Sequence, residues 1–170
     1  MEDASYILDV GTLFHSLLFA YQKTTKEILG SGSAIFVHPT LECLRRLDAK
    51  SGLGIMKGES LDDALNGFSK FLSKAKVVKD LRFQKVGPEK YLLCVDGCIW
   101  AKHIHRELNP KDVTCPHALI AMALFERHTG RKVKVAESKY LPEGTETVIE
   151  PLGDVEFQVV PAKTTITENK

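Results

Sequence analysis

The sequence predicts a single α+β domain in which helices pack on a twisted antiparallel sheet. Residues 5–29 repeat apolar side chains at helical spacing, whereas apolar and polar residues alternate from Val77 onward. Helices come first, followed by a hairpin, a further helix and more strands, an order that favours α+β architecture. The 170 residues, 44% of them hydrophobic, suffice for one core but not comfortably for two. We therefore assign residues 1–162 to one domain and residues 163–170 to a polar tail.

The first half of the chain carries three helical patterns. Residues 5–29 form an amphipathic pattern that Gly30 is well placed to end. A second, shorter pattern opens at Pro39, and a third begins at Ser60, whose hydroxyl and following acidic residues suit an N-cap. A glycine-rich connection separates these two. The broad apolar stripe of the first helix consists of Val10, Leu13, Phe14, Leu17, Leu18, Tyr21, Ile28 and Leu29.

The second half predicts a hairpin, a helix and further strands. Residues Val77–Val86 and Lys90–Trp100 alternate like two strands joined by a Gly-Pro turn. Residues 101–112 are polar and predict an irregular loop. Thr114–His128 predicts a helix with Thr114 as its N-cap and Gly130 at its end. The last expected strands are Lys132–Ser138, Thr145–Glu150 and Val155–Val160.

Net charge and hydropathy disfavour three classes of protein: nucleic-acid binders, membrane-spanning proteins and secreted proteins. The formal net charge is +1, so the basic surplus of a dedicated nucleic-acid binder is missing. No apolar run approaches the ~20 residues that span a bilayer, and the acidic first residues lack the basic start of a secretory signal. We therefore predict a cytoplasmic protein with reduced cysteines, no membrane span and no nucleic-acid partner. A basic band across residues 70–90 is either a solvated surface or a contact for an anionic partner.

Thiols and imidazoles are concentrated between residues 94 and 117. Zinc binds such ligands in a tetrahedron, and we predict that Cys98, His103, His105 and Cys115 hold it. The two histidines lie two residues apart, so both rings share one side of an extended segment. Cys115 is placed near a helix start, where unpaired N–H groups favour a thiolate. The alternative is that the cysteines are small core residues and the histidines are solvated.

Covalent catalysis is a further alternative. Cys115 as nucleophile with a nearby imidazole as base would make a thiol enzyme. The sequence marks out no acid and no oxyanion donor beside them, and it contains no phosphate-binding loop. A binding role without catalysis is therefore the expected class.

The segment from Tyr91 to Leu152 resembles a known family. A strand ends at Val95-Asp96-Gly97-Cys98, Cys115-Pro116 opens a small-residue helix that closes on Gly130, and a strand and a turn at Glu143-Gly144 follow. This order resembles the vinyl-4-reductase-type small-molecule-binding domain. That domain is related in fold to subunits of the TRAPP vesicle-tethering complex and to haem-based nitric-oxide sensors. The resemblance covers most of residues 5–152.

The resemblance implies a usually dimeric domain that binds small hydrocarbon-like molecules, with cysteines that hold a metal. Cys115 maps onto the family cysteine that opens the helix. The sequence departs from the family at Tyr140 and at residues 147–149, where further cysteines are expected, so the other ligands named above would have to replace them. No nucleotide-binding motif accompanies the resemblance, so no reductase activity is implied. Met122 and Phe125 are predicted to line the apolar cavity.

The leading hypothesis is thus a cytoplasmic, homodimeric binding or sensor domain with a structural zinc and a small apolar ligand. Two alternatives remain beside the thiol enzyme. One is a metal-free lipid carrier, and the other is a protein-interaction module.

Overall fold

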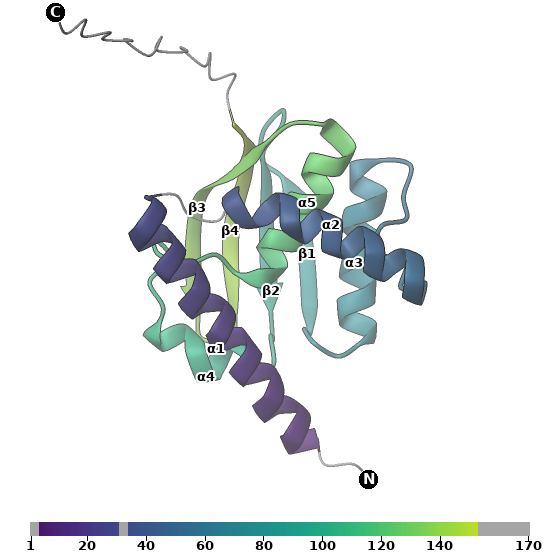
Figure 1. Cartoon of the computed structure of the whole chain (residues 1–170). Helices are drawn as coiled ribbons and strands as arrows, with labels where there is room; N and C mark the ends of the chain where they lie inside the picture. The colour runs from purple at the N-terminus through teal and green to yellow at the C-terminus, as the bar shows by residue number, and fades with distance from the viewer. Residues whose placement is uncertain (1–3, 31–33, 153–170) are drawn as a thin grey trace, which may run out of the picture.

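A computed structural model describes residues 4–30 and 34–152, and its strands form one antiparallel sheet (Figure 1). The strand order is β1-β2-β4-β3, so β1 and β3 are the edges. The strands are β1 (Asp80–Lys85), β2 (Tyr91–Asp96), β3 (Val133–Leu141) and β4 (Gly144–Pro151). The helices are α1 (Ala4–Leu29), α2 (Ala34–Ser51), α3 (Leu61–Lys74), α4 (Ala101–Ile104) and α5 (Pro116–Thr129), and a 3₁₀ turn covers His105–Glu107.

Helix α5 lies at the centre of the main core. Its small side chains let neighbours approach closely, and α2 and α3 both contact it. Phe68 of α3, Leu93 of β2 and Met122 of α5 are fully buried. The predicted fold class, with helices packed on an antiparallel sheet, is confirmed.

Local capping fixes the bounds of the helices that build this core. The Ser60 hydroxyl accepts a hydrogen bond from the Asp63 backbone N–H at 3.1 Å, and the Asp63 carboxylate accepts one in return from the Ser60 N–H. This capping box starts α3 where the sequence predicts it. Gly130 ends α5 in the left-handed conformation, with φ of 68°.

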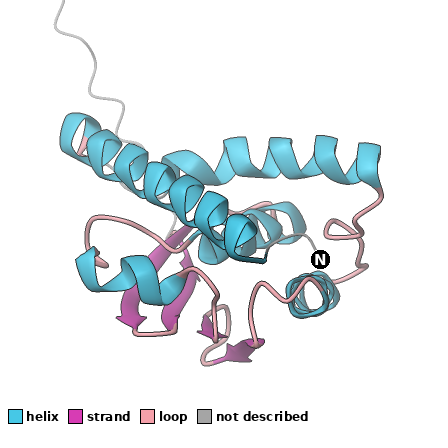
Figure 2. Cartoon of the chain, turned by 90° about the horizontal axis from the view of Figure 1, so that it is seen from below, coloured by secondary structure: helices cyan, strands magenta, loops and turns pink. Residues whose placement is uncertain are grey.

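Helices α1 and α2 lie on the side of the molecule away from the strands (Figure 2). Helix α2 contacts α5, whereas α1 contacts α4. Among the side chains that the structure describes, from residue 10 onward, none of α1 belongs to the main core; Phe19 belongs instead to a small second core with Ile104 and Val113. Helix α1 is therefore held by a smaller set of contacts than the other long helices.

Three predicted element bounds are wrong. Helix α2 begins at Ala34, so Pro39 lies inside it. Residues 101–107 are helical and not an irregular loop. Ala101 and Ile104 lie three residues apart and are both buried on one side of a single turn. The polar residues around them mask this short apolar pattern in the sequence. The N-cap of α5 is Cys115, without a side-chain capping bond. The expected strand over residues 155–160 and the tail over residues 163–170 lie outside the described residues. None of the described helices is long and apolar enough to span a bilayer.

Candidate functional site

The four predicted metal ligands do not form one site. Cys98 and Cys115 are 6% and 2% exposed and belong to the main core, whereas His103 is exposed. His105 is buried, and its Nδ1 lies 2.9 Å from the Leu141 carbonyl oxygen. A carbonyl can only accept, so Nδ1 carries the proton. Across residues 4–30 and 34–152, no three His, Cys, Asp or Glu side chains are grouped to hold a metal ion. The geometry therefore lends the zinc prediction no support.

The buried environment also disfavours the thiol-enzyme alternative. Burial raises the pKa of Cys115 to about 11 and also raises the pKa of Cys98. Desolvation thus outweighs the helix N-terminus that was expected to favour a thiolate. Both thiols remain protonated near neutral pH, so neither is an activated nucleophile.

A cluster of aromatic rings joins α1 to the start of α5. The His15 ring lies 5.2 Å from the Trp100 ring and 6.4 Å from the His117 ring, between ring centres. His117 stacks on Trp100 at an interplanar angle of 19°, and its Nε2 lies 3.8 Å from Cys98 Sγ. Burial lowers the pKa of His15 to about 4 and that of His117 to about 3. The cluster is therefore neutral at physiological pH.

Two polar atoms of this cluster are buried without a hydrogen-bond partner among the described residues. They are Nε2 of His15 and Nε1 of Trp100. His15 is not among the residues that the sequence predicts to form a site. The signal was its spacing from Phe19 and Gln22, which places all three on one face of α1. We call these three residues the inner face.

The inner face is fixed mainly by one polar contact. Gln22 is 2% exposed, its Nε2 donates to the Thr114 carbonyl oxygen, and the Thr114 backbone N–H donates to Gln22 Oε1, both at 2.9 Å. Lys26 adds an ion pair to Asp112 at 3.1 Å. These bonds pair the Thr114 backbone N–H and carbonyl oxygen just before α5, and they fix the position of α1 relative to α5.

The opposite side of α1 exposes large apolar side chains. Their positions recur at intervals of three, four and seven residues, so they share one face of the helix. We call this set the outer face. It consists of Leu13 (58% exposed), Phe14 (66%), Leu17 (44%), Tyr21 (67%) and Ile28 (73%).

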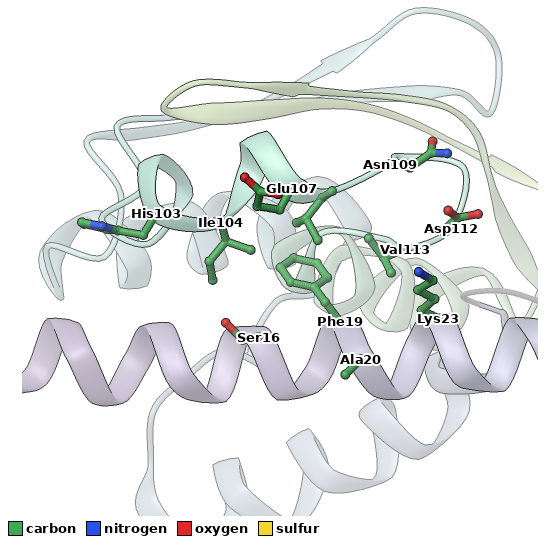
Figure 3. Close-up of a pocket in the computed structure, with 11 residues that line it drawn as sticks. Ser16, Phe19, Ala20, Lys23, His103, Ile104, Glu107, Asn109, Asp112 and Val113 are labelled. Atoms are coloured by element: carbon green, nitrogen blue, oxygen red, sulfur yellow. The ribbon is translucent and has the colours of Figure 1, made fainter.

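A pocket of about 450 Å³ lies between α1 and the segment from His103 to Val113 (Figure 3). Its floor is apolar, because Phe19, Ile104 and Val113 of the second core form it together with Leu108. The polar residues that line it are Ser16, Lys23, His103, Glu107, Asn109 and Asp112. The pocket was not predicted, since it needs α1 and a distant loop to meet.

The predicted cavity residues, Met122 and Phe125, lie elsewhere. They are 0% and 3% exposed in the main core, where Phe125 packs edge-on against Tyr91 with ring centres 5.6 Å apart. Both side chains fill the core in this structure. Their role in ligand binding stays a prediction.

Comparison with known proteins identifies the fold. No known family profile matches the chain, and no curated protein matches its sequence. It is similar to the crystal structure of a trafficking protein particle complex subunit 3 from Naegleria fowleri covalently bound to palmitic acid, with a TM-score of 0.50. The match has 12% identity and covers 87% of this chain and 96% of that one. The fold is that of a TRAPP subunit.

This likeness confirms part of the sequence-based hypothesis. The family resemblance implied a relation in fold to TRAPP subunits, and the comparison confirms this relation. Membership of the vinyl-4-reductase-type family is not shown by these comparisons and stays a prediction.

Proposed function

We propose that this chain is a protein-interaction module whose binding surface is the outer face of α1, and that this face docks a second copy of the chain. The observation that carries the proposal is the exposure of five large apolar side chains, between 44% and 73%, along one helix. Contiguous apolar patches on a protein surface mark interaction sites.

The extent of the outer face matches a dimer contact. A fully exposed large apolar side chain offers about 200 Å², so the five side chains present roughly 600 Å² of surface to a partner. Each partner in a standard interface contributes about 800 Å², and neighbouring polar atoms of α1 supply the difference.

The spacing of the outer face favours a second copy as the occupant. Phe14, Leu17, Tyr21 and Ile28 follow the three- and four-residue intervals of a helix-pairing seam. A two-fold axis would bring the same row of each copy together, so one surface supplies both sides of the contact. The structural neighbour is itself a subunit of a complex, which supports an assembly role.

The test is the mass in solution. The chain has a mass of 18.9 kDa, and light scattering coupled to size exclusion should give twice this value over a series of concentrations. The double variant Phe14→Asp, Tyr21→Asp should give the single-chain mass, because two carboxylates would be buried in the contact. Circular dichroism would verify that it is folded.

Matched controls place the same change on other exposed apolar residues. Leu47→Asp on α2 and Val86→Asp after β1 alter side chains that are 44% and 48% exposed, and both should keep the dimer mass. A wild-type chain that is monomeric at every concentration would refute the proposal, as would a double variant that keeps the dimer mass.

The finer predictions from the sequence remain to be tested. A structural zinc, a sensor role and a hydrocarbon-like ligand at Met122 and Phe125 are independent of the outer face. The cytoplasmic location is likewise a prediction. Metal analysis of protein purified without chelator tests the structural zinc, and less than about a tenth of an equivalent of metal would refute that prediction.

A further inference from the structure

We propose that the pocket between α1 and residues 103–113 binds a short apolar molecule with an ammonium group at one end and a carboxylate at the other. A tripeptide of apolar residues with free termini has this chemistry. The inference goes beyond the interaction module, since it concerns a different surface of α1.

The floor of the pocket suits the apolar body of such a molecule. Phe19, Ile104 and Val113 are 3%, 7% and 5% exposed, so they are packed in place, and Tyr140 supports them from the sheet. A Phe19–Tyr140 edge contact with ring centres 6.3 Å apart fixes the aromatic part of this floor. A volume of about 450 Å³ falls within the range of small-molecule sites.

The charges that line the pocket call for a ligand with both signs. Asp112 is neutralised by Lys26 at 3.1 Å. Lys23 and Glu107 have no ion pair or side-chain hydrogen bond among the described residues. A ligand of one charge would satisfy one of these two groups and leave the other unpaired, whereas a zwitterion complements both.

The arrangement of these groups separates the two charges. Figure 3 shows Lys23 beside Asp112 and Val113 at one end of the pocket, whereas Glu107 lies nearer Ile104. In this view Phe19 and Val113 of the floor lie between the cation and the anion. This order favours an elongated zwitterion over a single amino acid, whose two charges are adjacent.

A further donor lies at the Lys23 end. The Asn109 side-chain oxygen accepts a hydrogen bond from the Lys111 backbone N–H at 3.0 Å, so its amide NH₂ remains to donate. Ser16 already donates its hydroxyl to the Thr12 carbonyl oxygen at 2.9 Å. Lys23 and Asn109 therefore offer donors for a carboxylate, and Glu107 offers the acceptor for an ammonium group.

The test is calorimetric titration of the full chain with alanyl-leucyl-alanine, its N-acetyl form, its C-terminal amide and octanoate. The free tripeptide should bind with the highest affinity. Each blocked form should bind about fivefold more weakly, which is the scale of one partly exposed charge pair. Octanoate should bind no more tightly than the N-acetyl form, because both leave Glu107 unpaired.

Variants assign the two ends of the ligand. Glu107→Gln should weaken binding of the free tripeptide about fivefold and leave the affinity for the N-acetyl form unchanged. Lys23→Gln should likewise weaken binding of the free tripeptide about fivefold and leave the affinity for the C-terminal amide unchanged. Glu27→Gln is the matched control, because Glu27 is an exposed acid of α1 that does not line the pocket. Equal affinity for free and blocked forms, tighter binding of octanoate, or no saturable binding would overturn the proposal.

Discussion

The buried imidazoles make the stability of this protein dependent on pH. Burial is the main cause that lowers the pKa of His15 to about 4 and that of His117 to about 3. The charge of His105 lowers the pKa of His15 further, and the charges of His15 and His105 lower that of His117. In the unfolded chain each imidazole takes up a proton near pH 6.5. The unfolded state therefore binds more protons between about pH 6.5 and pH 4, and the folded state loses stability as the pH falls through this window.

The size of the effect follows from the two pKa values. One pKa unit corresponds to about 1.4 kcal/mol, so lowering the pH from about 7.5 to about 5 costs each histidine about 2 kcal/mol. Both side chains are at least 94% buried, at 6% and 3% exposure, so solvent screens little of this energy. Together they predict a loss of about 4 kcal/mol in the free energy of unfolding.

Urea titration at the two pH values, followed by the fluorescence of the single tryptophan, measures this loss. The Trp100 ring packs against both imidazoles, so its fluorescence reports on their surroundings. His15→Gln should reduce the difference between the two pH values by about 2 kcal/mol. Leu47→Gln changes an exposed residue of α2 and removes no titratable group, so as the control it should leave this difference unchanged. A His15→Gln protein with the wild-type pH dependence would refute the reasoning.

Four other predictions concern packing and chemistry. Gly11→Ala would place a Cβ 2.1 Å from Trp100 Nε1, and Gly144→Ala would place one 1.8 Å from the Val95 carbonyl oxygen. Urea titration should show that Gly11→Ala lowers the free energy of unfolding by about 1–3 kcal/mol, because the Trp100 side chain can move aside. Gly144→Ala should lower it by more, because the new Cβ meets the backbone of β2, which cannot move as easily. Cys115 should react with a thiol label only slowly at neutral pH and titrate near pH 11. Removing metal with a chelator should leave the unfolding midpoint unchanged, because the four predicted ligands do not converge.

The main helices and the sheet could be predicted because local chemistry decides them. The Ser60 cap, the glycine after α5 and the alternation in β2 each act within a few residues, and the structure has all three where expected. The single turn of α4 was missed because four residues are too few for a period to emerge. The pattern predicts a helix start at Pro39, whereas α2 begins five residues before it.

The site was harder to predict because it depends on how distant segments meet. Cysteine and histidine are concentrated between residues 94 and 117 of the sequence, but in the folded chain their side chains lie in different surroundings. Cys98 enters the core, His103 faces solvent and His105 bonds the end of β3. The ring that does meet Cys98 is His117, the second residue of α5, and its neighbour His15 comes from more than 80 residues earlier in the chain. Spacing along a sequence carries no information on such contacts.

The apolar stripe of α1 correctly predicts a helix, but several of its side chains face away from the core. In most domains such a stripe faces the core of the same chain. Here the inner face holds His15 and Gln22, while Phe14 and Tyr21 are about two-thirds exposed. A helix that buries polar groups and exposes aromatic ones would be costly unless the exposed face is covered. Among the described residues nothing covers this face, and that observation supports the proposal that a second copy of the chain docks on it.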